Sequence, residues 1–206
     1  EESVGLGVSR PMTLMAEVYD QPECPAGMSS RYRSPSRLAP VPNPLFIDFD
    51  DGSGPMSANE GGILSETRTL DMKQGILERV VRYKGKGGRI TQIVSRRLVS
   101  QARPHAVAIR YSLTPENYSG TVTITSTIER TATYPDGVEQ IRELGRGRTG
   151  RSVWMLVRTR QSRVQVAEAA RHVLSGAGHK SLNTTVVNER KKTGLALTFE
   201  ATRDRT

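Results

Sequence analysis

Strict alternation of apolar and polar residues recurs along this sequence and constrains its fold more than any other feature. In 121–128, for example, Val122, Ile124 and Ile128 share one side, and threonines occupy the other. A period of two residues predicts β-strands with one buried face, and a row of threonines is typical of a solvated or sheet-covered face of an antiparallel sheet. The same pattern, or an apolar run of strand length, occurs in 12–19, 45–49, 62–69, 75–83, 89–99, 106–113, 152–159, 182–189 and 195–199.

Turn-forming sequences separate these runs at short intervals, as in Asp51-Gly52, Gly61-Gly62 and Pro135-Asp136-Gly137. Many short strands with close turns favour two antiparallel sheets packed face to face. Sandwiches of this kind often reach about 200 residues as one unit, and this chain has 206. We therefore predict an all-β fold, with one large antiparallel β-sandwich domain over residues 1–206 and little helix.

Three segments depart from simple alternation. Residues 20–44 hold six prolines and are expected to form a long loop. Residues 135–150 are also expected to be irregular, because glycines interrupt them. In 163–174, valines and alanines fit helical spacing as well as alternation, and we expect a helix there.

The formal net charge of +9 raises the hypothesis of a nucleic-acid-binding protein. Most of the arginines, however, are spread through the predicted strands, and only residues 142–151 form a local basic cluster. We interpret the excess charge as a solvated face or as a surface matched to an acidic partner. Because of its glycines, the basic stretch is expected to be flexible, or to lie at the edge of the sandwich that meets such a partner.

Residues that could perform chemistry are few. Cys24 is the sole cysteine, which fits a reducing compartment and a cytoplasmic location. The three histidines lack the close spacing of a zinc site, so no metal, cofactor or catalytic residue is predicted; they are His105, His172 and His179. Trp154 lies within an apolar run and is expected in the core.

Glycoside cleavage needs two carboxyl groups facing each other in a concave pocket. Glu66 with Asp71, or Glu78, could supply such groups, but nothing in their surroundings singles them out. We interpret them as solvated carboxylates of strands or as partners for the abundant arginines.

The two ends of the sequence suggest a piece of a longer chain. The first residue is Glu1, and 202–206 directly follow a strand-like run. No run of eighteen apolar residues and no signal-like segment is present, so no membrane association is expected.

The most specific motif spans 63–79 and 95–100. Its key positions are Arg68, Leu70, Asp71, Gly75, Leu77 and Arg79, followed by Arg97 and Ser100. Asp71 can accept backbone N–H groups and Gly75 permits a positive φ, which predicts a strand–turn–strand hairpin. In order and spacing the motif resembles the N-terminal domain of glycoside hydrolase family 65, the family of maltose, trehalose and kojibiose phosphorylases and acid trehalases. Similar segments flank it at 15–20, 38–45 and 113–120.

The resemblance implies a non-catalytic β-sandwich whose motif positions are structural or lie at an interface. It implies as partner a C-terminal (α/α)₆ catalytic domain of the same polypeptide, with a homodimer as an open alternative. The parent enzyme would be an inverting phosphorylase or hydrolase with a maltose- or trehalose-like disaccharide substrate, and this chain alone would be inactive. Two rival functions stay open: a free-standing carbohydrate-binding β-sandwich, which exposed aromatic residues would favour, and a basic nucleic-acid-binding domain, which a continuous positive stripe would favour.

Overall fold

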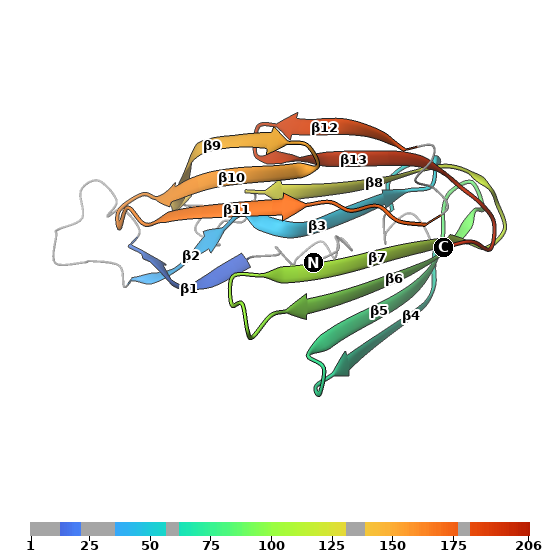
Figure 1. The fold of residues 1–206 in the computed structure, drawn as a ribbon, viewed down its shortest axis with the longest axis horizontal. Coiled ribbons are helices and arrows are strands. Elements are labelled where there is room, and N and C mark those ends of the chain that lie inside the picture. Colours follow the sequence, from blue (N-terminus) through green and yellow to red (C-terminus); the bar gives the residue numbers. More distant parts are fainter. Residues whose placement is uncertain (1–12, 22–35, 57–61, 131–138, 177–181) are drawn as a thin grey trace.

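A computed structural model describes residues 13–21, 36–56, 62–130, 139–176 and 182–206 (Figure 1). Within these ranges the chain forms thirteen β-strands and no helix, and every strand pair is antiparallel. The predicted all-β class is therefore confirmed.

The strands form four sheets. The central sheet has the order β12-β13-β8-β3, comprising β12 (Asn183–Glu189), β13 (Lys192–Ala201), β8 (Gly120–Glu129) and β3 (Asn43–Asp50). The sheet that carries the sequence motif, here the motif sheet, has the order β4 (Gly62–Asp71), β5 (Ile76–Lys84), β6 (Ile90–Val99) and β7 (Val107–Pro115). A three-stranded sheet contains β11 (Gln165–Arg171), β10 (Ser152–Thr159) and β9 (Ile141–Thr149), and a two-stranded ribbon contains β1 (Thr13–Asp20) and β2 (Arg37–Val41).

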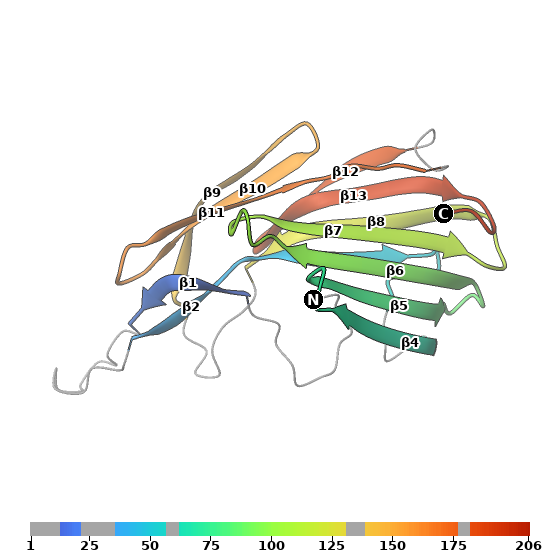
Figure 2. The same cartoon turned by 60° about the horizontal axis from the view of Figure 1, so that its bottom comes forward.

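One face of the central sheet is covered along its length, and this makes the sandwich. In both views the motif sheet lies toward one end of the long central strands, and the three-stranded sheet and the ribbon lie toward the other (Figures 1 and 2). The buried cluster beneath the motif sheet consists of Phe49, Val81, Tyr83, Ile93, Leu113, Val122 and Ala201. The second cluster consists of Val18, Ala39, Val41, Ile128, Ile141, Val153, Met155, Val157, Val166, Leu195 and Leu197.

The expected helix in 163–174 is wrong, because this segment contains strand β11. Seven consecutive residues of β11 pair with β10 in an unbroken register. Val166 packs into the core, and the side chains of Glu168 and Ala170 follow it on the same face at a period of two. A segment of this length has too few turns to be stable as a helix without packing, so pairing with the neighbouring strand decides its conformation.

The two expected irregular segments are wrong in part. Residues 37–41 of the proline-rich segment form β2, where Pro40 is tolerated because the ribbon is a two-stranded edge structure. Residues 141–149 form β9, which pairs with β10 along its whole length. Backbone hydrogen bonds in this ladder hold the glycine-rich stretch in place, so it is not a loop. Residues 22–35, with Cys24, and 131–138 lie outside the described residues.

Candidate functional site

The motif hairpin has the predicted turn. The carboxylate Oδ1 of Asp71 accepts the backbone N–H of Gln74 at 3.0 Å, and Gly75 has a φ of +66°. A side chain at that φ would be strained, which explains the glycine. The motif positions gather at one end of the motif sheet, because the β4–β5 turn lies beside the end of β6 that carries Arg97 and Ser100. The hydroxyl of Ser100 accepts the N–H of Arg103 at 3.0 Å.

Arg79 and Glu66 form the polar centre of this end. The guanidinium of Arg79 is almost fully buried and lies 3.0 Å from Glu66 Oε1. Arg68 approaches the same oxygen from the exposed side at 2.6 Å. The hydrogen bond from Arg79 holds the pKa of Glu66 below its usual value, against the opposite effect of burial.

The three carboxylates considered for glycoside cleavage have structural partners. Glu78 pairs with Arg96 across β5 and β6, Asp71 holds the hairpin turn, and Glu66 pairs with two arginines. The interpretation of Glu66 and Glu78 as arginine partners is therefore confirmed.

Beyond Arg79, the inner face of the motif sheet carries apolar side chains that the central sheet does not cover. Leu70 and Leu77 face each other across β4 and β5, and Val99 faces Val107 across β6 and β7. These four residues, here the apolar end, continue the face of Val81 at a period of two. Leu70 is 61% exposed and Val99 is 58% exposed. An uncovered apolar group of this kind, on the face that elsewhere forms the core, is a candidate contact surface.

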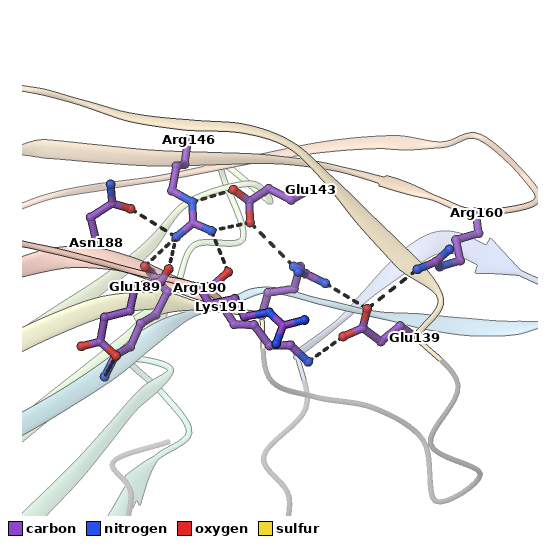
Figure 3. Close-up of polar contacts among 10 residues, drawn as sticks. Glu139, Glu143, Arg146, Arg160, Asn188, Glu189, Arg190 and Lys191 are labelled. Atoms are coloured by element: carbon purple, nitrogen blue, oxygen red, sulfur yellow. Dashed lines mark hydrogen bonds and ion pairs between the residues drawn. The ribbon is translucent and has the colours of Figure 1, made fainter.

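In the basic stretch 142–151, Arg146 is the centre of a network of ion pairs and hydrogen bonds (Figure 3). The guanidinium of Arg146 forms a two-pronged pair with Glu143, at 2.5 and 2.7 Å. It also donates to the backbone carbonyl groups of Arg190 at 2.9 Å and Lys192 at 2.8 Å. Arg146 therefore ties β9 to the turn between β12 and β13, and the expected flexibility of this stretch is wrong.

The carboxylate of Glu139 extends this network. Glu139 lies 2.6 Å from Lys191, 3.5 Å from Arg130 and 3.8 Å from Arg160 (Figure 3). The hydrogen bond from Lys191 is the main cause that lowers the pKa of Glu139. The carboxylates of Glu139 and Glu143 interrupt the positive charge in this part of the surface, and the cluster is not a continuous positive stripe.

Trp154 is not in the core, contrary to the sequence-based expectation. Val153, Met155 and Val157 are buried, and Trp154 lies on the opposite face of β10 with 41% of its surface exposed. Its ring lies over two glycines of β9, and a Cβ added to Gly147 would come within 2.7 Å of Trp154 Cζ2. Alternation through 152–158 could have predicted this orientation.

Glu168 is a half-buried titratable residue with a buried carboxyl oxygen, and it was not among the residues singled out from the sequence. Its Oε2 is buried without a hydrogen-bond partner, and burial raises its pKa to about 8. The sequence could have predicted this orientation, because Glu168 lies two residues after Val166, on the same core-facing side of β11.

The histidines in the described part of the chain show no arrangement for catalysis or metal binding. His172 bonds to Ser126 Oγ at 2.9 Å and to the carbonyl of Arg151 at 3.0 Å, and His105 is exposed in the β6–β7 connection. His179 lies outside the described residues. No three His, Cys, Asp or Glu side chains come together as a metal site in the part of the chain that the structure describes. Across the same residues, no helix has the length and apolar character needed to span a membrane.

Comparisons with known proteins agree on one family. The family model described as "Glycosyl hydrolase family 65, N-terminal domain" matches residues 1–206. An uncharacterised glycosyl hydrolase of Mycobacterium tuberculosis is 30% identical over 152 residues, which are 69% of this chain and 11% of that protein. The alpha,alpha-trehalose phosphorylase of Thermoanaerobacter brockii is 29% identical over 63% of this chain and 18% of the enzyme. A kojibiose phosphorylase of Halothermothrix orenii is 36% identical over 48% of this chain and 13% of the enzyme.

A solved structure provisionally assigned as a kojibiose phosphorylase from the human microbiome has the same fold. The TM-score is 0.73 at 13% identity, and the match covers 91% of this chain and 24% of that one. This chain therefore spans a small part of each relative, from 11% to 18% of the curated proteins named above. These matches do not favour a free-standing carbohydrate-binding module or a nucleic-acid-binding domain.

Proposed function

The chain belongs to glycosyl hydrolase family 65 as its N-terminal, non-catalytic domain, and from this premise we propose that the whole protein is a phosphorylase or hydrolase of α-glucosyl disaccharides. Two of the relatives are a trehalose and a kojibiose phosphorylase, which supports sugars of this size and linkage. The reaction would invert the anomeric carbon, with an acid that protonates the glycosidic oxygen while phosphate or water attacks the opposite face.

The catalytic groups would lie outside this domain, in an (α/α)₆ barrel of the same polypeptide. The relatives are several times longer than the matched region, which leaves ample chain for such a barrel. The single cysteine supports a cytoplasmic location, which fractionation of cells that express the whole protein would test.

The observation that carries the proposed role is the apolar end of the motif sheet. Leu70, Leu77, Val99 and Val107 extend the core face past its covering sheet, and the family-like motif residues surround them. Burial of this surface would stabilise a contact at roughly 25 cal/mol per Å² of apolar area removed from water. We therefore assign the apolar end as the surface that receives the catalytic part of the chain.

The test compares the same substitutions in the whole protein and in the 206-residue chain. The double variant Leu70→Asn with Leu77→Asn should lower the melting temperature and turnover of the whole protein. It should leave the isolated chain's melting temperature nearly unchanged, because both side chains are already exposed there. Val186→Asn is the control, since Val186 is an exposed apolar residue of β12, which belongs to the central sheet and not to the motif sheet.

Two outcomes would contradict this assignment. An unchanged whole protein would show that the apolar end has no partner in it. A shift from dimer to monomer, with turnover and melting temperature retained, would assign the surface to a homodimer instead.

Activity is tested separately from the interface. The whole protein should consume trehalose, kojibiose or maltose, with phosphate if it is a phosphorylase. The 206-residue chain should consume none of them under the same conditions. Turnover by the chain alone would overturn its non-catalytic role.

A further inference from the structure

Four arginines surround one small hollow on the three-stranded sheet. Arg142 comes from β9 and Arg158 from β10, and the turn after β10 contributes Arg160 and Arg163. With Thr159 they line a space of about 180 Å³. We call this site the arginine hollow.

The positive charges in the arginine hollow are poorly matched by carboxylates. Arg142 and Arg158 are direct partners across β9 and β10, an arrangement in which like charges destabilise a sheet. Arg160 lies 3.8 Å from Glu139, but that carboxylate also serves Lys191 and Arg130 (Figure 3). Among the residues that the structure describes, no carboxylate pairs with Arg142, Arg158 or Arg163.

A buried aspartate fixes the turn that presents two of these arginines. Asp20, at the end of β1, is 1% exposed. Its carboxylate accepts the backbone N–H groups of Arg160 at 3.1 Å, Gln161 at 3.1 Å and Ser162 at 2.8 Å. Within the turn, the N–H of Val164 donates to the hydroxyl of Thr159 at 2.8 Å. The turn is therefore held rigidly from both sides.

Arg163 has a strained backbone in this turn. Its φ is +63°, a left-handed conformation that is costly for a residue with a Cβ. A glycine or asparagine would meet the same geometry with less strain. Strain held in place by the surrounding structure is a feature of binding sites, and here it falls on one of the four arginines.

We propose that the arginine hollow binds a phosphate group, as free phosphate or as the end of a small phosphate ester. Guanidinium groups match phosphate oxygens with paired hydrogen bonds, and a dianion would neutralise the opposed charges of Arg142 and Arg158. The space is smaller than the roughly 300 Å³ at which pockets for larger organic ligands begin, so a sugar ring would remain outside it. The proposal does not depend on the proposed function, because it needs this domain alone.

The test follows the melting temperature of the chain as inorganic phosphate is added at constant ionic strength, balanced with sodium chloride. The wild-type chain should show a saturable rise. Arg142→Gln should melt higher than wild type in the absence of phosphate at low salt, because it removes a like-charge pair, and should lose the saturable rise. If Arg142 served only to stabilise the fold, Arg142→Gln would instead melt lower than wild type in the absence of phosphate.

Arg110→Gln is the matched control. Arg110 is exposed and opposes Arg96 across β6 and β7, so its removal changes the net charge equally without touching the arginine hollow. This variant should keep the full phosphate response. An equal, non-saturating response in all three proteins would reduce the effect to general screening and overturn the proposal.

Two further anions separate the sources of the ligand. Methyl phosphate should match inorganic phosphate if the site takes phosphate esters, and should be weaker if it takes the free ion alone; either result supports the proposal. Acetate at the same concentration should have no saturable effect. If acetate equals phosphate, the arginine hollow is a carboxylate site, and the proposal is wrong.

Discussion

At the scale of single residues, Glu168 is the group through which pH should act most strongly on folding. Its carboxyl is buried without a hydrogen-bond partner on Oε2, and its pKa is raised from 4.5 to about 8. Below pH 4.5 the folded and unfolded chains both carry the proton. Between pH 4.5 and 8 only the folded chain keeps it, so the free energy of unfolding falls as pH rises through this window.

Glu168→Gln should therefore flatten the pH dependence of stability. The neutral amide has nearly the same shape and removes a loss of up to about 1.4 kcal/mol per pH unit. At pH 8 the variant should be more stable than wild type by an amount on the order of a few kcal/mol. Urea unfolding at pH 5, 6.5 and 8 measures the effect, and the exposed Glu17→Gln is its control. Parallel curves for the variant and wild type would contradict the prediction.

His172 should lower the stability of the folded chain as the pH falls. Burial lowers its pKa from 6.5, and its two ring nitrogens are engaged with Ser126 and the carbonyl of Arg151. The unfolded chain takes up the proton first as pH falls through 6.5, so this residue reduces stability on acidification. Together, the two groups favour folding at mildly acidic pH over either extreme.

Asp71 contributes to stability through its turn. Asp71→Ala removes the acceptor for the N–H of Gln74 and should lower the free energy of unfolding by about 1 kcal/mol, as with other lost side-chain caps. Asp71→Asn keeps an acceptor oxygen and should retain most of the stability. The melting temperatures of the two variants, compared with wild type, provide the measurement. If Asp71→Ala has the same melting temperature as wild type, Asp71 does not stabilise the turn and its role lies at the interface.

At the scale of elements, the sequence predicted strands correctly where alternation is strong. The prediction was wrong where pairing with a neighbouring strand determines the conformation. Each strand of the motif sheet and of the central sheet overlaps a predicted run, although several extend beyond it, such as β13 (Lys192–Ala201) against 195–199. Strand β11 was misassigned because its alanines fit a helix equally well, and only the free edge of β10 selects the extended form. Strand β9 was missed because Gly145 and Gly147 resemble a flexible loop, although their role is to let the ring of Trp154 lie against the strand.

Strand β9 therefore supplies a prediction with an internal control. Gly147→Ala places a Cβ 2.7 Å from Trp154 Cζ2, whereas the Cβ of Gly145→Ala would meet the ring at 3.6 Å, an ordinary contact distance. Gly147→Ala should lower the free energy of unfolding by about 1–3 kcal/mol, the usual range for overpacking. It should also shift the fluorescence of the chain's single tryptophan, while Gly145→Ala should change both measurements little. Equal effects from both substitutions would show that the ring moves freely.

At the scale of the whole molecule, the distribution of charge follows from how the sheets are joined. Carboxylates pair with arginines between neighbouring strands, as Glu66 does with Arg79, and within one strand, as Glu143 does with Arg146. Part of the net charge of +9 lies where two arginines face each other, as Arg142 and Arg158 do across β9 and β10. The sequence showed the excess, but not its location, because the location depends on which strands become neighbours.

Asp20 joins parts of the chain that are about 140 residues apart, and its removal should be felt by the molecule as a unit. Its buried carboxylate accepts three backbone N–H groups of the β10–β11 turn, and Asp20→Ala removes this acceptor, although the N–H of Arg160 also donates to the carbonyl of Gln140 at 2.9 Å. A buried donor left without an acceptor costs roughly 1–3 kcal/mol, and we expect a total loss within that range because these donors are only partly buried. Asp20→Asn keeps one acceptor oxygen and should fall between wild type and Asp20→Ala. Thermal unfolding followed by circular dichroism would show a single transition at a lower temperature. A small early transition with the main one unchanged would show instead that the ribbon unfolds separately from the sandwich.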